Sequence, residues 1–209
     1  MAYRNKALLR ETSPYNASLT SEQFLFYETR ITAGLIIEGL NQREIIDRVF
    51  KENLFQYPTE KSLKRIAGIC CRRLETLNDK TLIHAITTES SETAKQICLY
   101  AMMKQHRLVW DFMIVVVGGK YRHMETSFSK NDITAFVTRL REQDDLVATW
   151  SDSTISKITQ VLGKILAENG YLDSVRTKKL NRVSISPILE NAIRSAGQEY
   201  ALPAFNCLS

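Results

Sequence analysis

The sequence of 209 residues has few of the side chains from which metal and catalytic sites are usually built. It contains three histidines and four cysteines, and no Cys-x-x-Cys pair. The histidines are scattered, so neither the ligand spacing of a zinc site nor an arrangement for acid–base chemistry is present. We therefore expect no metal, no cofactor and no small-molecule substrate, and we predict that the protein is not an enzyme.

Three short patterns resemble catalytic motifs but lack their partners. Gly118–Lys120 is similar to the end of a phosphate-binding loop, yet the upstream glycine is missing and Tyr121 replaces the magnesium-binding hydroxyl. Ser127 and Lys130 have the Ser-x-x-Lys spacing without a second motif. The pair Asp144–Asp145 is better explained as the start of a helix than as a metal site.

Long apolar runs are also lacking. The longest, Leu108–Val117, is interrupted by Asp111 and is too short to cross a bilayer, so we expect a buried helix there and no membrane partner. The basic N-terminal residues are not followed by the apolar stretch of a secretory signal. Cys70 and Cys98 fit apolar helix faces and are expected to be buried free thiols, which suits a cytoplasmic location.

The charge of the chain is mildly basic and unevenly distributed. There are 28 Lys and Arg residues against 23 Asp and Glu, a net charge of +5. Between Asp173 and Glu190 the sequence contains four cations and no acid. Such a distribution favours a polyanionic partner without requiring one.

Helical periodicity dominates the N-terminal half. Thr20 with Gln23 predicts a capping box for a helix that runs to about residue 40. A shorter helix is predicted over Gln42–Glu52, followed by an amphipathic helix over Glu60–Thr76 with opposite apolar and basic faces. Two short helices of which the second is basic are typical of a helix-turn-helix DNA-binding unit. The alternative is a surface helix with a solvated charged face.

The C-terminal half predicts a similar order with an added hairpin. Helices are expected after Ser129 and after residues 151–153, then two short strands over Tyr171–Val175 and Arg182–Ile185, then a helix that begins at Pro187. This order is typical of a winged helix, although a basic loop on a helical domain is the alternative. We therefore predict a mainly α protein with two helical lobes. The N-terminal lobe (1–119) is helix-turn-helix-like, the C-terminal lobe (130–209) is winged-helix-like with a small β-hairpin, and residues 120–129 form a linker.

The candidate DNA-binding residues come from three elements: the basic face of the helix over 60–76, the outer face of the helix after residues 151–153, and the segment 176–182. Basic side chains reach phosphates, Gln reaches base edges, and a glycine lets a partner's backbone approach closely. The candidates are Lys61, Lys64, Arg65, Gly68, Arg72, Lys157, Gln160, Lys164, Arg176, Lys178, Lys179 and Arg182.

The sequence also resembles a known family. The residues that carry the resemblance are Glu28, Gly39, Glu44–Ile45, Asn53–Gln56, Ser62–Ile66, Arg73–Leu77, Gly170–Leu172 and Ile185–Ser186. Together they resemble the BrxA family of BREX (bacteriophage exclusion) systems. The resemblance implies a non-enzymatic, cytoplasmic, mostly helical component of a phage-defence locus, similar in part to NusB-type antitermination proteins. It also implies affinity for DNA and other BREX proteins as partners, and it supplies no catalytic residues.

Three functions remain open at this point. The first is a double-stranded DNA-binding component that uses the basic helix and the basic wing, mainly through phosphate contacts. The second is an RNA-binding, NusB-like antitermination or regulatory factor, which the same basic helices would suit. The third is a protein-interaction adaptor whose charges are only solvated.

Overall fold

The computed structural model describes residues 13–208, in which the regular elements are all helices. The described chain divides into two compact units, and each is discontinuous in sequence. Unit 1 comprises residues 13–23, 106–185 and 196–208, whereas unit 2 comprises 24–105 and 186–195. The prediction of a mainly α protein is confirmed, and each unit is considered by itself below.

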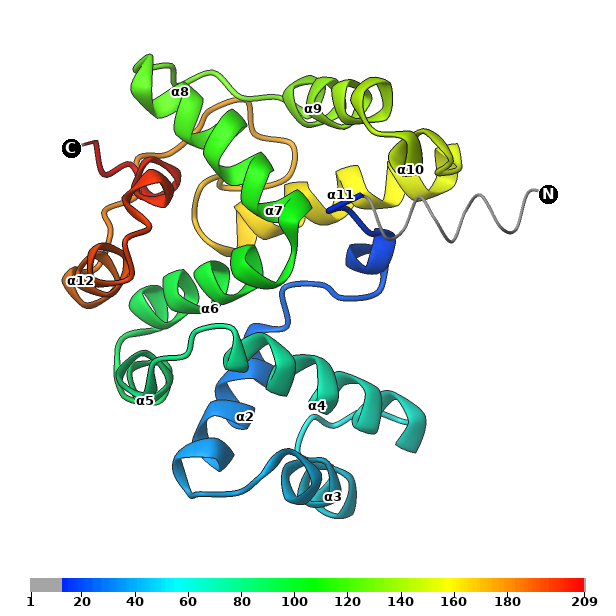
Figure 1. Ribbon diagram of the computed structural model, residues 1–209, viewed down its shortest axis with the longest axis vertical. Helices are drawn as coiled ribbons and strands as arrows, with labels where there is room; N and C mark the ends of the chain where they lie inside the picture. Colours follow the sequence, from blue (N-terminus) through cyan, green and yellow to red (C-terminus); the bar gives the residue numbers. More distant parts are fainter. Residues whose placement is uncertain (1–12, 209) are drawn as a thin grey trace. The chain divides into compact units, whose positions relative to one another are not determined.

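Unit 2 contains six of the helices labelled in Figure 1. They are α2 (Phe26–Ile37), α3 (Gln42–Glu52), α4 (Glu60–Glu75), α5 (Lys80–Thr88), α6 (Ser91–Gln105) and α12 (Pro187–Ser195). The predicted bounds of α3 are confirmed, because Asn41 and Glu44 form a capping box at its start. Those of α4 are confirmed to within one residue, with Thr59 as its N-cap.

The predicted capping box at Thr20 is wrong. The Thr20 hydroxyl donates backwards to the carbonyl of Ala17 at 2.8 Å and belongs to the short 3-10 helix η1 (Ala17–Thr20). Helix α2 begins only at Phe26, after Leu25 takes a left-handed backbone conformation with φ of 54°. The Thr-x-x-Gln pattern therefore does not begin the long helix. The threonine hydroxyl is already engaged in the hydrogen bond to Ala17 within η1.

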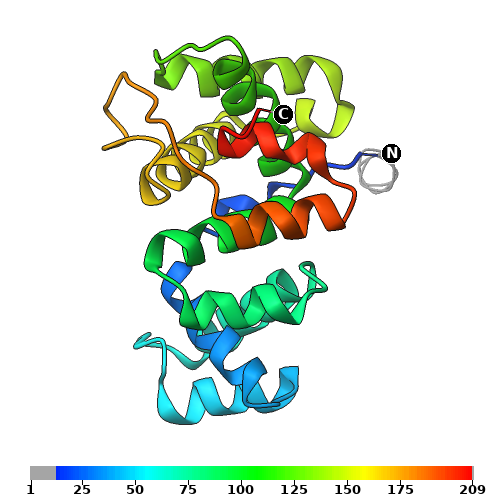
Figure 2. The same cartoon turned by 90° about the vertical axis from the view of Figure 1, so that its left-hand side faces the viewer.

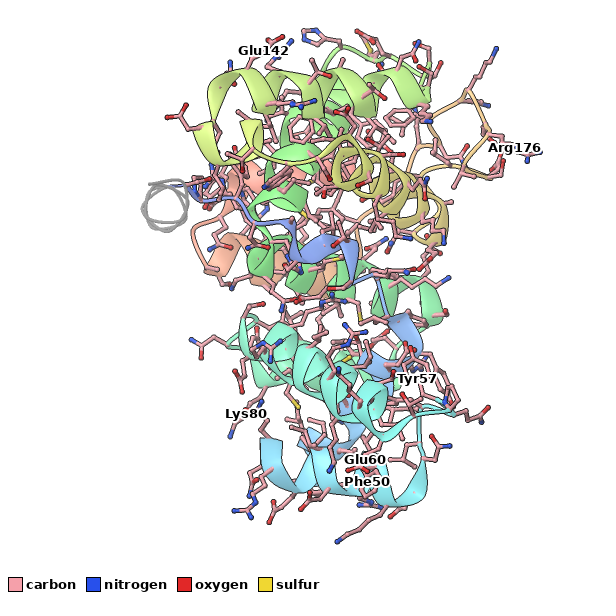
Figure 3. The ribbon with its side chains drawn as sticks, turned by 90° about the vertical axis from the view of Figure 1, so that its right-hand side faces the viewer. Phe50, Tyr57, Glu60, Lys80, Glu142 and Arg176 are labelled. Atoms are coloured by element: carbon pink, nitrogen blue, oxygen red, sulfur yellow. The ribbon has the colours of Figure 1, made fainter. Side chains whose placement is uncertain are left out.

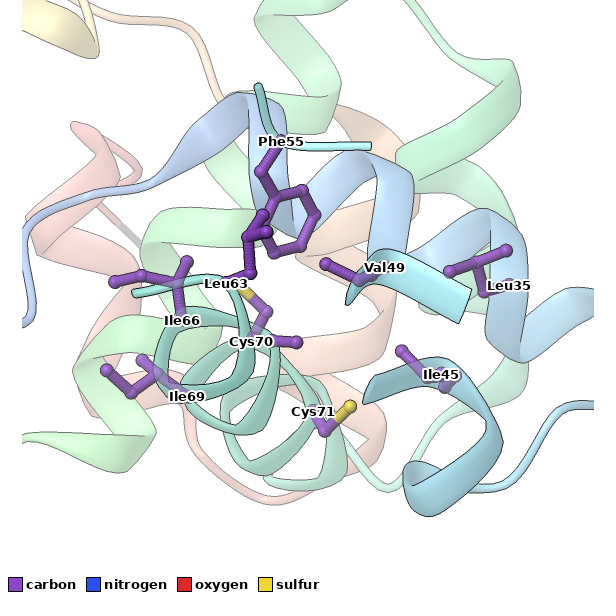
Figure 4. Close-up of a cluster of buried hydrophobic side chains, with 10 residues drawn as sticks. Leu35, Ile45, Val49, Phe55, Leu63, Ile66, Ile69, Cys70 and Cys71 are labelled. Carbon is purple, nitrogen blue, oxygen red and sulfur yellow. The ribbon is translucent and has the colours of Figure 1, made fainter. Parts of the chain in front are cut away.

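The core of unit 2 lies where α4 packs against α2 and α3 (Figure 4). The apolar face predicted for α4 is buried there, together with side chains from α3 and the loop that follows it. The cluster consists of Leu35, Ile45, Val49, Phe55, Leu63, Ile66, Ala67, Ile69, Cys70 and Cys71. Cys70 and Cys98 are buried free thiols as predicted, and Cys71 is buried as well.

A fully buried arginine connects three segments of unit 2. Arg73 on α4 has no exposed surface. Its guanidinium donates to the carbonyl of Phe24 at 2.5 Å, and its Nε donates to Oε1 of Gln105 at 3.0 Å. These hydrogen bonds tie α4 to the start of α2 and to the end of α6, so that the buried charge has polar partners.

Helix α12 belongs to unit 2 although the sequence places it in the C-terminal lobe. It contacts α5 and α6, beside which its ribbon runs in Figure 2. Leu189 and Ile193 are fully buried, and the amide of Ser186 donates to Oε1 of Gln96 at 2.8 Å. The units therefore differ from the predicted lobes (1–119 and 130–209), because an amphipathic helix does not reveal which distant segment covers its apolar face.

Unit 1 is built from the remaining elements. They are η1, α7 (Arg107–Asp111), the π-helical segment η2 (Phe112–Val117), α8 (Gly118–Arg122), α9 (Lys130–Gln143), α10 (Asp145–Ala148), α11 (Asp152–Glu168) and η3 (Glu199–Phe205). Segments α7, η2 and α8 follow one another directly, so the apolar run forms a largely buried helix as predicted. The predicted caps Ser129 and Ser151 are also confirmed.

The predicted β-hairpin is wrong. The described residues contain no strand, and segments 171–175 and 182–185 do not pair with each other. Tyr171 and Leu172 are both buried, whereas successive residues of a half-buried strand point to opposite faces. Residues 178–180, which lie between these two segments, pair instead with the predicted linker (120–129). The amide of Phe128 donates to the carbonyl of Lys178 at 3.0 Å, and the amide of Leu180 donates to the carbonyl of Thr126 at 2.7 Å.

The buried arginine leads to a stability prediction. We expect Arg73→Ala to lower the free energy of unfolding by about 3–5 kcal/mol, because it leaves a cavity and removes a buried donor from its acceptors. The matched control is Arg72→Ala at the neighbouring exposed position, for which we expect a change within about 0.5 kcal/mol. Urea denaturation followed by circular dichroism measures both. Equal effects of the two substitutions would contradict the structural role of Arg73.

Candidate nucleic-acid interface

The basic face of α4 is exposed, as the helical periodicity predicts. Lys61, Lys64, Arg65 and Arg72 all reach solvent, whereas the apolar residues of the same helix are buried. We call these four cations the α4 face. They follow helical spacing over about three turns and belong to unit 2 alone.

Lys64 and Arg72 of the α4 face each lie close to other groups of unit 2. Lys64 forms an ion pair with Glu60 and lies over the ring of Phe50, with 4.6 Å from Nζ to the ring centroid. Phe50 and Glu60 are both labelled in Figure 3. Gly68 is buried, and a guanidinium nitrogen of Arg72 lies 3.5 Å from the position of an added Cβ. The predicted approach of a partner's backbone at Gly68 therefore requires Arg72 to move.

A hydrogen bond that the sequence did not reveal holds the loop before α4. The hydroxyl of Tyr57 donates to the carboxylate of Glu28 on α2, and the amide of Tyr57 donates to Oδ1 of Asn53 at 3.1 Å. Partial burial, and then the hydrogen bond with Glu28, raise the pKa of Tyr57 above its ordinary value. The loop is thereby fixed beside the start of the α4 face. Glu28 and Asn53 are among the residues that carry the family resemblance. That resemblance was the sequence signal that could have drawn attention to this contact.

The second basic surface lies on unit 1 and begins on α11. The buried residues of this helix include Ile158, Leu162 and Ile165, so the opposite side is free to carry polar groups. Gln160 and Lys164 are exposed there, and Lys157 is half-buried. The predicted inward and outward faces of α11 are confirmed at these positions.

The segment that follows α11 presents four more cations. Arg176, Lys178, Lys179 and Arg182 are all exposed, and Arg176 projects outward from its loop in Figure 3. The loop has a defined backbone, because Asn181 donates to the carbonyl of Tyr171 at 2.8 Å in addition to the bonds with residues 126–128. The basic segment is thus neither a hairpin nor a free loop.

A small pocket joins α11 to this loop. It has a volume of about 220 Å³ and lies between α9, α11 and residues 172–177. Its lining consists of Phe128, Lys130, Ile133, Thr159, Gln160, Gly163, Lys164, Leu172, Val175 and Thr177. Two of the predicted contacts, Gln160 and Lys164, therefore lie beside the loop that carries Arg176. Arg182 lies apart from this pocket and lines a different hollow together with Glu125.

The cations around this pocket have no acidic partner within the part of the chain that the structure describes. We call Lys157, Gln160, Lys164, Arg176, Lys178 and Lys179 the α11–loop surface. None of its five cations lies within ion-pair distance of a described carboxylate. Elsewhere in unit 1, by contrast, Lys120 pairs with Asp132 at 2.9 Å and Arg141 pairs with Asp152 at 2.9 Å.

The structure gives no support to the weak catalytic motifs. Gly118 lies within the continuous helix, where an added Cβ would be 3.1 Å from Pro203, and Lys120 is ion-paired with Asp132. No group of three or more His, Cys, Asp or Glu side chains in residues 13–208 is placed to hold a metal. Burial raises the pKa of the Cys70 thiol to about 11. None of the described helices combines the length and apolar character needed to cross a membrane.

The described residues thus define a helical protein with two exposed basic surfaces, one on each unit. Comparison with known proteins identifies the family. The BrxA family model matches residues 13–197. A curated relative from Bacillus cereus (strain H3081.97), named BREX protein BrxA, is 35% identical over 175 residues, covering 84% of this chain and 86% of the relative. The chain belongs to the BrxA family of BREX proteins.

More distant relatives extend over most of the chain. A BREX protein BrxA from Escherichia coli O9:H4 (strain HS) is 26% identical over 92% of this chain and 90% of the relative. A crystal structure of an uncharacterized protein from Magnetospirillum magneticum has a TM-score of 0.80 and 26% identity. It covers 92% of this chain and 98% of that chain, so the same fold occurs in an experimental structure.

The loop before α4 leads to a prediction about local stability. We expect Tyr57→Phe to lower the free energy of unfolding by about 1–2 kcal/mol, because the Glu28 carboxylate loses a donor in a partly buried site. The control is Tyr27→Phe on α2, whose side chain is 54% exposed and for which we expect no measurable change. Thermal and urea unfolding report both variants. No difference between the two tyrosines would show that the Tyr57 hydroxyl does not hold the loop.

Proposed function

We propose that this chain is a non-enzymatic component of a BREX phage-defence system that binds double-stranded DNA, mainly through phosphate contacts. The α11–loop surface is the principal contact, and the α4 face is a second one, with α3 and α4 acting as a helix-turn-helix-like pair. The relatives' names make other BREX proteins its proposed protein partners.

One observation carries this proposal: the five cations of the α11–loop surface, of which four are exposed and Lys157 is half-buried, have no acidic partner among the described residues. Clustered like charges repel one another, and a row of phosphates relieves that repulsion. A cation without an ion pair can also contact a phosphate without first losing a carboxylate. Lys64 of the α4 face, in contrast, must exchange Glu60 for the phosphate.

Phosphate contacts fix the position of a protein on DNA without reading its sequence. Gln160 is the single uncharged member of the α11–loop surface, and Gln is a side chain that can pair with adenine in the major groove. We therefore propose weak sequence preference, with affinity that comes chiefly from Lys and Arg.

The salt dependence of binding tests the DNA proposal. Each phosphate contact should contribute about −0.9 to the slope of log K against log salt, so we expect a slope steeper than about −2 between roughly 50 and 200 mM. Fluorescence anisotropy with a labelled duplex measures this slope, and structured and single-stranded RNA serve as competitors. A flat salt response, or RNA that displaces duplex at lower concentration than unlabelled duplex does, would refute the proposal.

Two triple variants with the same change in charge locate the contact. We expect Lys164→Ala, Arg176→Ala and Lys178→Ala together to weaken binding across DNA sequences and to reduce the magnitude of the salt slope by roughly one per contact. The matched variant carries Lys61→Ala, Arg65→Ala and Arg72→Ala, which also removes three positive charges, in this case from the α4 face. We expect a smaller loss for this variant.

The outcomes of this comparison are distinct. Equal losses in the two triple variants would mean that net charge alone drives binding. A loss confined to the α4 variant would assign the principal contact to unit 2. Circular dichroism of each variant establishes that the fold is retained before the affinities are compared.

A further inference from the structure

We infer that the pocket between α9, α11 and residues 172–177 holds a single unpaired nucleobase of bound DNA. We call it the α11–loop pocket. The inference rests on the proposed function, since it assigns a specific ligand to a cavity in the surface proposed to contact DNA. It extends that function from phosphate contacts to the recognition of a base that is not paired in a duplex.

The size of the pocket limits what can occupy it. Its volume of about 220 Å³ lies below the range of about 300–1,000 Å³ that is usual for pockets of drug-sized ligands and cofactors. A single planar ring system is a better match. Gly163 is buried on α11 and lines the pocket without a side chain. An added Cβ at that position would be in ordinary van der Waals contact with Cδ1 of Ile133, at 3.6 Å, so a larger side chain would compete for the space beside Ile133.

The lining combines apolar walls with hydrogen-bonding groups. Phe128, Ile133 and Leu172 form apolar walls, and each is 2–3% exposed. The amide of Gln160 offers a donor and an acceptor, and the hydroxyl of Thr159 donates to the carbonyl of Ile155 at 3.0 Å, which leaves its oxygen able to accept. A nucleobase has apolar faces and polar edges and so matches both parts of the lining.

The charges at the pocket favour a nucleic acid over an acidic peptide with an apolar side chain. Lys130 and Lys164 line the pocket, no acidic residue does, and Arg176 lies on the same loop as Val175 and Thr177. Both ligands would satisfy the lysines. An aliphatic or phenyl side chain, however, would cover the amide of Gln160 without replacing its hydrogen bonds, which carries a cost. The edge of a base replaces them.

A base inside an intact duplex cannot reach such a pocket without leaving the stack. Extrusion costs a few kcal/mol, and the cost is smallest for a base that is mismatched or already unpaired. The pocket therefore predicts tighter binding to duplexes with one bulged base than to fully paired duplexes of the same length. Both kinds of duplex should show the same dependence on salt, because they share the phosphate contacts.

Competition anisotropy with the full chain tests this inference. We expect a duplex with one bulged adenine to compete about tenfold better than the fully paired duplex, since an unpaired base avoids most of the extrusion cost. Gly163→Leu, which fills the pocket, should abolish this ratio and leave the affinity for paired duplex unchanged. Ala135→Leu, an exposed substitution on α9 outside the pocket lining, is the matched control and should keep the ratio. If Gly163→Leu does not fold, Gly163→Ala is tested in its place. We then expect the ratio of bulged to paired competition to be lower than in the wild type but above one.

The failure of this inference differs from failure of the proposed function. A wild-type ratio of one, with salt-dependent binding to paired duplex retained, would overturn the pocket assignment alone. A tenfold ratio that persists in Gly163→Leu would overturn it as well, because the base would then lie elsewhere. If the wild-type protein does not bind duplex DNA at all, the proposed function is overturned. An acidic phenylalanine peptide that binds the wild type more tightly than the bulged duplex, but does not bind Gly163→Leu, would make the pocket a peptide site.

Discussion

Two backbone hydrogen bonds between residues 126–128 and 178–180 determine the form of the surface proposed to bind DNA. They join the amide of Phe128 to the carbonyl of Lys178 and the amide of Leu180 to the carbonyl of Thr126, and Leu180 is 1% exposed. Because Leu180 is apolar and buried and the residues next to it are cations, the segment has a fixed backbone while its charged side chains remain in solvent. Without these hydrogen bonds, residues 172–177 would not be held in place as one wall of the α11–loop pocket.

The cations on the α11–loop surface differ from several other cations of the protein in having no acidic partner among the described residues. In unit 2, Lys64 is paired with Glu60 and Arg48 is paired with Glu38. In unit 1 the α11–loop surface has no described acidic partner, although Lys120 and Arg141 elsewhere in the unit do. Uncompensated charge destabilises a compact state through repulsion. A partner that supplies the opposite charge, as proposed above, would offset this repulsion.

The sequence predicted the helices well and their tertiary partners poorly. The bounds of α3 followed from Asn41 and Glu44, because a capping box is a local interaction that four residues specify. The strands predicted at 171–175 and 182–185 were wrong, because Tyr171 and Leu172 are both buried in an irregular segment. The residues between the two predicted strands, 178–180, bond instead to the distant segment 126–128. Helix α12 illustrates the same limit. The spacing of Leu189 and Ile193 indicates an apolar face, but only the structure shows that α5 and α6 cover this face.

The candidate site shows the same division between local and distant information. Helical spacing alone was enough to place Gln160 and Lys164 on the outer face of α11, because that face is defined by the buried side of a single helix. The pocket beside them was not predictable, since Phe128, Gly163 and Leu172 come from three segments that meet only on folding. Gly163 is instructive here. On α11 it reads as a weak point in a helix, where alanine would be preferred by about 1 kcal/mol. In the fold it lines the α11–loop pocket without a side chain, and the proposed base would occupy the space that a larger residue would take in this seventeen-residue helix.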